Sequence, residues 1–159
     1  MTRPHVPGVD DAPFDREQAE PVPIVGVMME GATLVEGVAL GAFPVDGDDA
    51  TGYLAAWIAG QSWHPALQAV VLGGITLAGL GLVDVTALAE ALRVPVLVVT
   101  RRDTAGSTLD RALRAAGLED RLPILERTPP ATALGPGLYV ACAGTDAETA
   151  GRLVKATTG

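Results

Sequence analysis

Residues 23–43 read PIVGVMMEGATLVEGVALGAF. Two apolar runs, residues 23–30 and 33–43, have the composition of β-strands, and Gly31-Ala32 between them offers a tight turn. This segment therefore predicts a β-hairpin.

The segments around the hairpin predict further strands and helices. An apolar run from His5 ends at Asp10-Asp11, and further strand-like runs occupy residues 69–72, 95–99, 122–125 and 138–143. Helical spacing of apolar residues predicts helices within residues 53–58, 85–92, 109–116 and 150–154. An antiparallel hairpin start followed by parallel strands that alternate with helices predicts an α/β fold, a mixed sheet with helices on both faces.

Capping signals mark where these helices begin. Asp48 or Asp49 would cap the first helix, and Asp84 the second. Residues 107–110 and 145–148 resemble capping boxes, in the second case with Thr145 as the capping residue.

Length and composition describe one globular domain. A chain of 159 residues fits a single domain over residues 1–159, and its mean hydropathy of +0.32 excludes a disordered chain. The net charge of −8 has the opposite sign to that of a protein that binds nucleic acid through bulk charge. Phe, Tyr and Trp each occur only twice, which argues against aromatic platforms for base stacking.

Cysteine use and hydropathy predict a cytoplasmic protein. The single Cys142 excludes an internal disulfide, as in a reducing compartment, and residues 1–8 lack the apolar core of a signal peptide. Residues 50–83 carry no formal charge when His64 is neutral, but Pro65 interrupts the first half and glycines at positions 73, 74, 79 and 81 interrupt the second. We therefore expect a buried helix and a central strand there, and no membrane span.

Aspartates follow two of the predicted strands. Asp10 and Asp11 end the first strand, while Asp46, Asp48 and Asp49 follow the third. Polar groups at the carboxyl ends of strands line the ligand crevice in such folds, and carboxylates from separate strands would suit Mg²⁺. The alternative is structural, because aspartates in turns accept backbone hydrogen bonds and cap helices.

Other strand ends allow two interpretations each. Gly73-Gly74 would either cradle a phosphate or allow close backbone packing, and it lacks a Walker or dinucleotide pattern. Arg101-Arg102 would either contact phosphates or form a solvated rim.

No His-x-x-x-His or Cys-x-x-Cys spacing occurs, so the sequence does not predict a zinc site. Cys142, inside an apolar strand, is predicted to be a small core residue.

Five segments resemble one family in order along nearly the whole chain. They are residues 8–14 (GVDDAPF), 45–51 (VDGDDAT), 71–79 (VLGGITLAG) followed by 83–85 (VDV), 95–102 (PVLVVTRR) and 137–144 (GLYVACAG). Together these segments resemble the endonuclease dU family, which is mostly archaeal.

This resemblance implies an RNase H-like fold related to endonuclease V, and a Mg²⁺- or Mn²⁺-dependent endonuclease that cuts DNA near deoxyuridine. By position, the implied catalytic carboxylates are Asp10, Asp11 and Asp49. The implied metal ligands are Asp10, Asp49 and Asp84. Arg101, Arg102 and Thr76 are the residues expected to bind nucleic acid.

One departure from the family pattern bears directly on activity. The family has Leu-Asp-Gly where this chain has Leu72-Gly73-Gly74, so a central ligand is missing. The chain is therefore either a working or weakened endonuclease, or a degenerate relative that binds nucleic acid or protein without cutting. A small-molecule binder on a similar sheet is a third hypothesis. Low charge and apolar helix surfaces also make a homodimer plausible.

Overall fold

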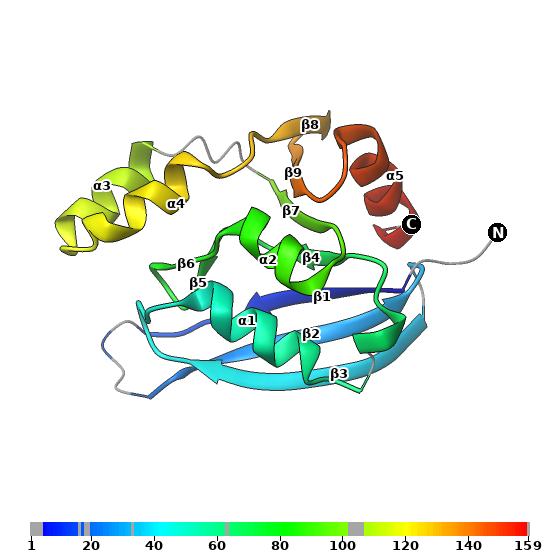
Figure 1. Ribbon diagram of the computed structural model, residues 1–159, viewed down its shortest axis with the longest axis horizontal. Coiled ribbons are helices and arrows are strands. Elements are labelled where there is room, and N and C mark those ends of the chain that lie inside the picture. The colour runs from blue at the N-terminus through cyan, green and yellow to red at the C-terminus, as the bar shows by residue number, and fades with distance from the viewer. Residues whose placement is uncertain are drawn as a thin grey trace.

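The computed structural model describes residues 5–15, 17, 20–32, 34–62, 64–101 and 107–158. Within these residues, a mixed β-sheet carries helices on both faces (Figure 1). The strands are β1 (His5–Asp11), β2 (Val22–Glu30), β3 (Leu34–Phe43), β4 (Val70–Leu72), β5 (Thr76–Leu77), β6 (Gly81–Leu82), β7 (Val96–Thr100), β8 (Thr132–Gly135) and β9 (Leu138–Ala143). The helices are α1 (Ala50–Ala59), α2 (Val85–Leu92), α3 (Ser107–Ala115), α4 (Leu122–Glu126) and α5 (Ala147–Thr158), with short 3₁₀ turns at His64–Ala66 and Glu119–Arg121.

The described strands of the main sheet follow the order β3-β2-β1-β4-β7-β9-β8, and β5 pairs only with β6. The predicted hairpin is confirmed as β2 and β3, and β1 pairs antiparallel with β2. Strands β1, β4 and β7 are parallel, whereas β9 and β8 run antiparallel to their neighbours. The mixed, RNase H-like sheet expected from the sequence is therefore present, with an antiparallel pair at its second edge as well.

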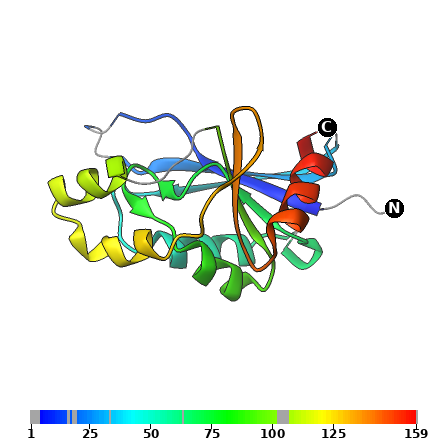
Figure 2. The same cartoon turned by 90° about the horizontal axis from the view of Figure 1, so that it is seen from above.

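The core has two layers because side chains alternate along each strand. In β7, Val96 and Val98 pack into the cluster that contains the buried residues of α1 and α2. Leu97 between them packs with Ala150 and Val154 of α5. Helix α5 therefore covers the face opposite to α1 and α2, and Figure 2 shows this arrangement from above.

Residues 122–125 were wrongly predicted as a strand, because they form most of helix α4. A short apolar run does not distinguish a strand from a buried helix. The 3₁₀ turn Glu119–Arg121 leads directly into this helix, and proline stands in its first turn, where a missing N–H breaks no hydrogen bond. The short strands β5, β6 and β8 were not predicted.

Two helix caps agree with the sequence and one differs. Asp49 caps α1 and Asp84 caps α2. For α5 the capping oxygen belongs to Asp146, whose Oδ1 accepts a hydrogen bond from Thr149 N at 2.7 Å, and not to Thr145. The residue before α3 lies outside the described residues, so the capping box predicted there stays a prediction.

The uncharged stretch at residues 50–83 forms α1, β4, β5 and β6, in line with a buried helix followed by a central strand. In the part of the chain that the structure describes, none of the helices has both the length and the apolar character needed to cross a membrane.

Candidate active site

Four strand ends meet at one edge of the sheet. Strands β1, β4 and β7 are parallel, and β3 has the same direction because it is antiparallel to β2, which is antiparallel to β1. Their carboxyl ends carry or precede Asp10, Asp49, Gly73 and Arg101. The expected convergence of polar strand ends is therefore built into the topology, as can be followed in Figure 1.

Asp10 and Gly73 are neighbours at this edge. Val9 pairs with Leu72, and Gly73 N donates to Val9 O at 3.4 Å, so the next residues of the two strands stand side by side. A Cβ atom at position 73 would lie 2.5 Å from Asp10 Oδ2. The side chain that the family pattern has at position 73 would therefore adjoin the Asp10 carboxylate.

The carboxyl group of Asp10 lies next to that of Asp11. Its Oδ1 accepts a hydrogen bond from Asp11 N at 2.9 Å, and the residue is exposed. Partial burial of the carboxyl group, together with its contact with the Asp11 side chain, raises the pKa of Asp10 above its ordinary value. A cation here would offset both the desolvation and the repulsion between the two carboxylates.

Asp11 and Asp46 have structural partners. Asp11 Oδ2 accepts a hydrogen bond from Ala78 N at 2.7 Å, and Asp46 Oδ1 accepts one from Leu80 N at 2.8 Å. Both bonds hold the turn between β5 and β6, where Ala78 has a left-handed backbone with φ of 53°. The structural interpretation of aspartates in turns thus describes these two residues.

Asp49 and Asp84 stand at the starts of adjacent helices. Asp49 Oδ1 accepts a hydrogen bond from Gly52 N at 3.0 Å, and the backbone N of Asp84 donates to Thr51 Oγ1 of α1 at 2.8 Å. Asp84 is buried, caps α2, and accepts a 2.7 Å hydrogen bond from Arg127 Nε. This ion pair already neutralises Asp84, which weakens it as a metal ligand.

The structure describes two of the three residues expected to bind nucleic acid. Arg101 is exposed directly after β7, whereas Thr76 is half-buried in β5. Arg102 lies outside the described residues.

Sequence reasoning missed Arg121, which is buried beneath the active-site edge. Its guanidinium donates to Leu80 O at 2.6 Å, to Asp46 O at 2.8 Å and to Asp48 Oδ1 at 2.7 Å. It thereby ties the β5–β6 turn to the loop before α1. The one sequence signal was its position directly before the apolar run at residues 122–125.

Among the described residues, one group of three His, Cys, Asp or Glu side chains has ligand atoms all within 4.8 Å of one another. It comprises His5, Glu30 and Glu36 and lies at the opposite end of β1. The predicted set of Asp10, Asp49 and Asp84 does not form such a compact group.

Cys142 is half-buried against the α5 side of the core, and its Sγ lies 3.4 Å from Thr145 O. Burial, and secondarily the charge of Asp146, raises the pKa of this thiol. Because the thiolate is the reactive form, we expect Cys142 to react several-fold more slowly with iodoacetamide at pH 8 than N-acetylcysteine does. The difference between the two reaction rates should narrow as the pH rises, because a larger fraction of the Cys142 thiol is then ionised. A rate equal to that of the free thiol at pH 8 would contradict the placement of Cys142.

The sheet order, with three parallel central strands and an antiparallel hairpin at one edge, defines an RNase H-like fold. The sequence matches the endonuclease dU family over residues 3–159, and the chain belongs to that family. A UPF0215 protein of Methanothermobacter thermautotrophicus is 32% identical, over 95% of this chain and 76% of its own length.

Solved structures show the same fold. A protein of unknown function from Archaeoglobus fulgidus superposes with a TM-score of 0.87 at 30% identity, over 97% of this chain and 86% of its own. Endonuclease V of Ciona intestinalis, in complex with a 24-mer DNA containing an inosine followed by a ribo-adenosine, superposes with a TM-score of 0.55 at 13% identity. That match covers 97% of this chain and 77% of endonuclease V, and at this identity it establishes the fold alone.

Proposed function

We propose that this protein is a divalent-metal-dependent endonuclease that acts on deoxyuridine-containing DNA, with Asp10 as its principal metal ligand. Family membership supports the reaction class. The observation that carries the proposal is the exposed Asp10 carboxylate at the carboxyl end of β1, directly beside position 73 on β4. This is the centre of the edge where polar groups of an open α/β sheet gather.

The residues present fit a weakly held Mg²⁺ or Mn²⁺ ion. Mg²⁺ commonly binds through one or two carboxylates, keeps several waters, and takes phosphate oxygens of the substrate. Asp10 would be the direct ligand, and Asp49, which caps α1 through Oδ1, would offer Oδ2 at the same edge. When bound, such an ion supplies charge stabilisation at a phosphoryl oxygen and an acidified water.

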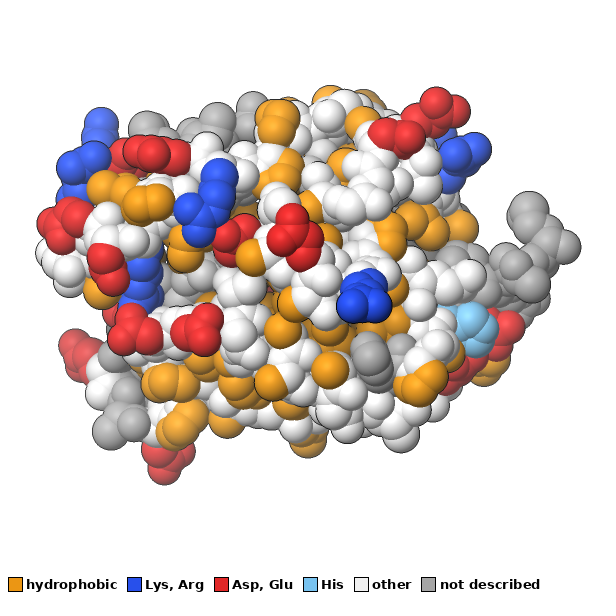
Figure 3. All heavy atoms as spheres, in the orientation of Figure 1, with side chains coloured by type: hydrophobic (Ala, Val, Ile, Leu, Met, Phe, Trp, Pro, Cys, Tyr) orange, Lys and Arg blue, Asp and Glu red, His pale blue; other side chains and the backbone are white. Residues whose placement is uncertain are grey.

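Binding of DNA must be local, because the net charge of the chain is −8. On the face drawn in Figure 3, basic and acidic side chains are interspersed, and no continuous basic surface is visible. Arg101, which is exposed directly after β7, would contact a phosphate. Weak association that falls steeply with salt follows from a small number of phosphate contacts against an acidic background.

The direct test compares nicking of two duplexes that differ only by one deoxyuridine in place of thymidine. Each duplex is incubated with the full chain in Mg²⁺, in Mn²⁺ and in EDTA. The proposal requires metal-dependent cutting that is faster on the deoxyuridine duplex. Equal cutting of both duplexes, or cutting that persists in EDTA, would contradict it.

Gly73→Asp is expected to strengthen Mn²⁺ binding by about tenfold or more, because it adds a carboxylate beside Asp10. The same change should destabilise the metal-free protein, since a Cβ there crowds Asp10 and the new charge repels it. Calorimetric titration measures the first effect, and urea unfolding in EDTA the second.

Gly74→Asp is the matched control. It adds the same charge one residue further on, where a Cβ would meet nothing within 4 Å. Equal gains in Mn²⁺ affinity from both variants would show that general charge, and not proximity to Asp10, strengthens binding.

A second candidate function is a non-cutting binding module. Two observations favour it: position 73 has no side chain, and the three predicted ligands do not form a compact group among the described residues. Binding of the deoxyuridine duplex without nicking in any metal, together with nicking by Gly73→Asp, would establish this candidate.

The homodimer stays a prediction, and edge strand β3 is where we expect it to form. Val38 and Leu40 on this strand are 62% and 73% exposed, and an exposed apolar edge strand is a template for pairing with another chain. Sedimentation analysis of the wild type and of Leu40→Lys tests this prediction.

A further inference from the structure

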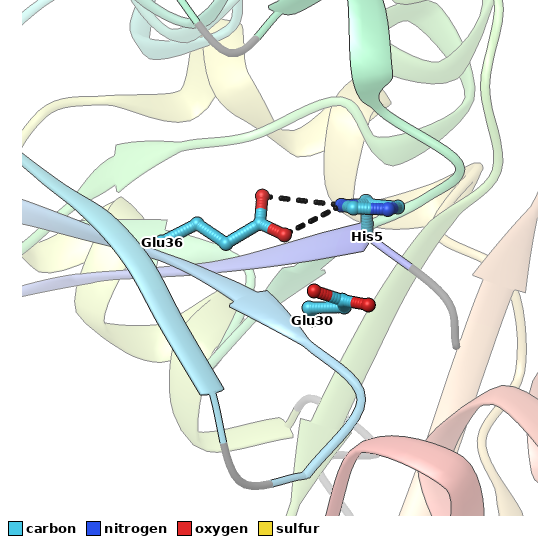
Figure 4. Close-up of side chains that lie close together, drawn as sticks. All are labelled: His5, Glu30 and Glu36. Atoms are coloured by element: carbon cyan, nitrogen blue, oxygen red, sulfur yellow. Dashed lines mark hydrogen bonds and ion pairs between the residues drawn. The ribbon is translucent and has the colours of Figure 1, made fainter. Parts of the chain in front are cut away.

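Three ligand side chains converge where the first three strands lie side by side. His5 begins β1, Glu30 ends β2, and Glu36 lies near the start of β3. His5 Nδ1 is 3.1 Å from both carboxylate oxygens of Glu36, and the ligand atoms of all three residues lie within 4.8 Å of one another. Figure 4 shows the Glu36 carboxylate facing the imidazole, with the Glu30 carboxylate next to them.

The pairing of the three strands brings Glu36 into this group. His5 pairs directly with Glu30, so their side chains share a face of the sheet. Between β2 and β3, Met28 pairs with Gly37 and Met29 with Val35, which leaves Glu36 as the extra residue. Glu30 pairs with Leu34, so Glu36, two residues further along β3, lies on the same face of the sheet as Glu30 and His5. The extra residue then lets Gly37, which pairs with Met28, keep that face as well.

The backbone of His5 is held by Gln68. The backbone N of His5 donates to Gln68 Oε1 at 2.7 Å, and Gln68 N donates to His5 O at 3.0 Å. Two hydrogen bonds to one residue fix the start of β1, and the sheet fixes the two glutamates. Such preorganisation is what a metal site needs, because its ligands must already stand near their bound positions.

The ligand chemistry selects a metal of the zinc class. Two ligands at about 2.0–2.1 Å from a tetrahedral ion lie roughly 3.3 Å apart, close to the 3.1 Å between His5 Nδ1 and the Glu36 oxygens. Imidazole suits transition metals, whereas Mg²⁺ prefers oxygen ligands alone. Two carboxylates against one imidazole leave an excess of negative charge for a divalent cation.

We propose that His5, Glu30 and Glu36 bind one zinc-class divalent ion, with water in the fourth position. This site is distinct from the one at Asp10, because Asp10 lies five positions further along β1 than His5, about 17 Å in a strand. The ion joins three strands, so its binding stabilises the folded chain. The inference does not depend on the nuclease proposal.

The test is calorimetric titration of Zn²⁺ into the tag-free, chelator-treated full chain. We expect one equivalent to bind, Mg²⁺ in excess not to compete, and Zn²⁺ to raise the melting temperature. His5→Asn, Glu30→Gln and Glu36→Gln should each weaken Zn²⁺ binding by about tenfold or more and reduce the thermal shift. Glu90→Gln, which removes an exposed charge from α2, is the matched control and should bind Zn²⁺ as the wild type does.

Asp10→Asn and Cys142→Ser separate this site from other ligands in the chain, and both should retain Zn²⁺ binding. X-ray absorption of the bound ion should show a single imidazole and oxygen neighbours. The proposal is overturned if no stoichiometric binding occurs, if the three variants bind as the wild type does, or if either Asp10→Asn or Cys142→Ser abolishes binding. His5 and Glu36 would then form an ion pair only.

Discussion

Asp10→Asn is expected to lower the rate of metal-dependent nicking by roughly 10³-fold or more, the scale of loss when a residue at the centre of a catalytic unit is removed. The substitution keeps the shape of the side chain and removes the charge that would hold the ion. The three atoms nearest to a Cβ at position 73 all belong to the Asp10 carboxyl group. The measurement is single-turnover nicking of the deoxyuridine duplex in Mg²⁺ and in Mn²⁺.

Two other substitutions serve as controls for this loss of nicking. Asp110→Asn removes a half-buried carboxylate of α3 that pairs with Arg114, and it should leave nicking unchanged. Asp11→Asn should act mainly on stability, because Asp11 Oδ2 accepts the hydrogen bond from Ala78 N that holds the β5–β6 turn. Retention of full activity by Asp10→Asn would remove the basis of the proposed function.

Arg121→Met is expected to lower the free energy of unfolding by about 3 kcal/mol. The buried guanidinium donates to the carbonyl oxygens of Leu80 and Asp46, and a methionine leaves both acceptors without this donor. The midpoint of urea unfolding measures the change, with the slope checked for constancy.

Asp48→Asn is the matched control for Arg121. The Asp48 side chain is 90% exposed, so water replaces much of what the ion pair with Arg121 supplies. We expect a loss below about 1 kcal/mol. If the two variants destabilise the chain equally, the exposed ion pair, and not the bonds to the buried carbonyl groups, dominates the role of Arg121.

Much of the fold could be predicted because it depends on local patterns. Two apolar runs around Gly31-Ala32 predicted β2 and β3, and helical spacing after Asp49 and Asp84 predicted α1 and α2. Alternation of strands and helices then placed Asp10, Gly73 and Arg101 at one edge of the sheet. Helix α4 was missed because four apolar residues carry no distinct period, and the turn before it, which includes the buried Arg121, decides its conformation.

Local sequence patterns could not distinguish the roles of the individual aspartates. Asp10, Asp11, Asp46, Asp49 and Asp84 have the same side chain, and the sequence allowed each to be either a ligand or a turn residue. Hydrogen bonds from distant residues, such as Ala78 N to Asp11 and Arg127 to Asp84, now distinguish them. These partners lie 67 and 43 residues away along the chain.

The order of residues alone established the α/β class, the family and the acidic strand end, because periodicity, turn residues and short motifs act over a few positions. Tertiary structure decided which carboxylates remain available, and it assembled His5, Glu30 and Glu36 although no zinc spacing exists in the chain. The physical reason is strand register: His5 pairs with Glu30 and Glu30 with Leu34, so side chains from three strands share one face, and no local sequence pattern records that pairing.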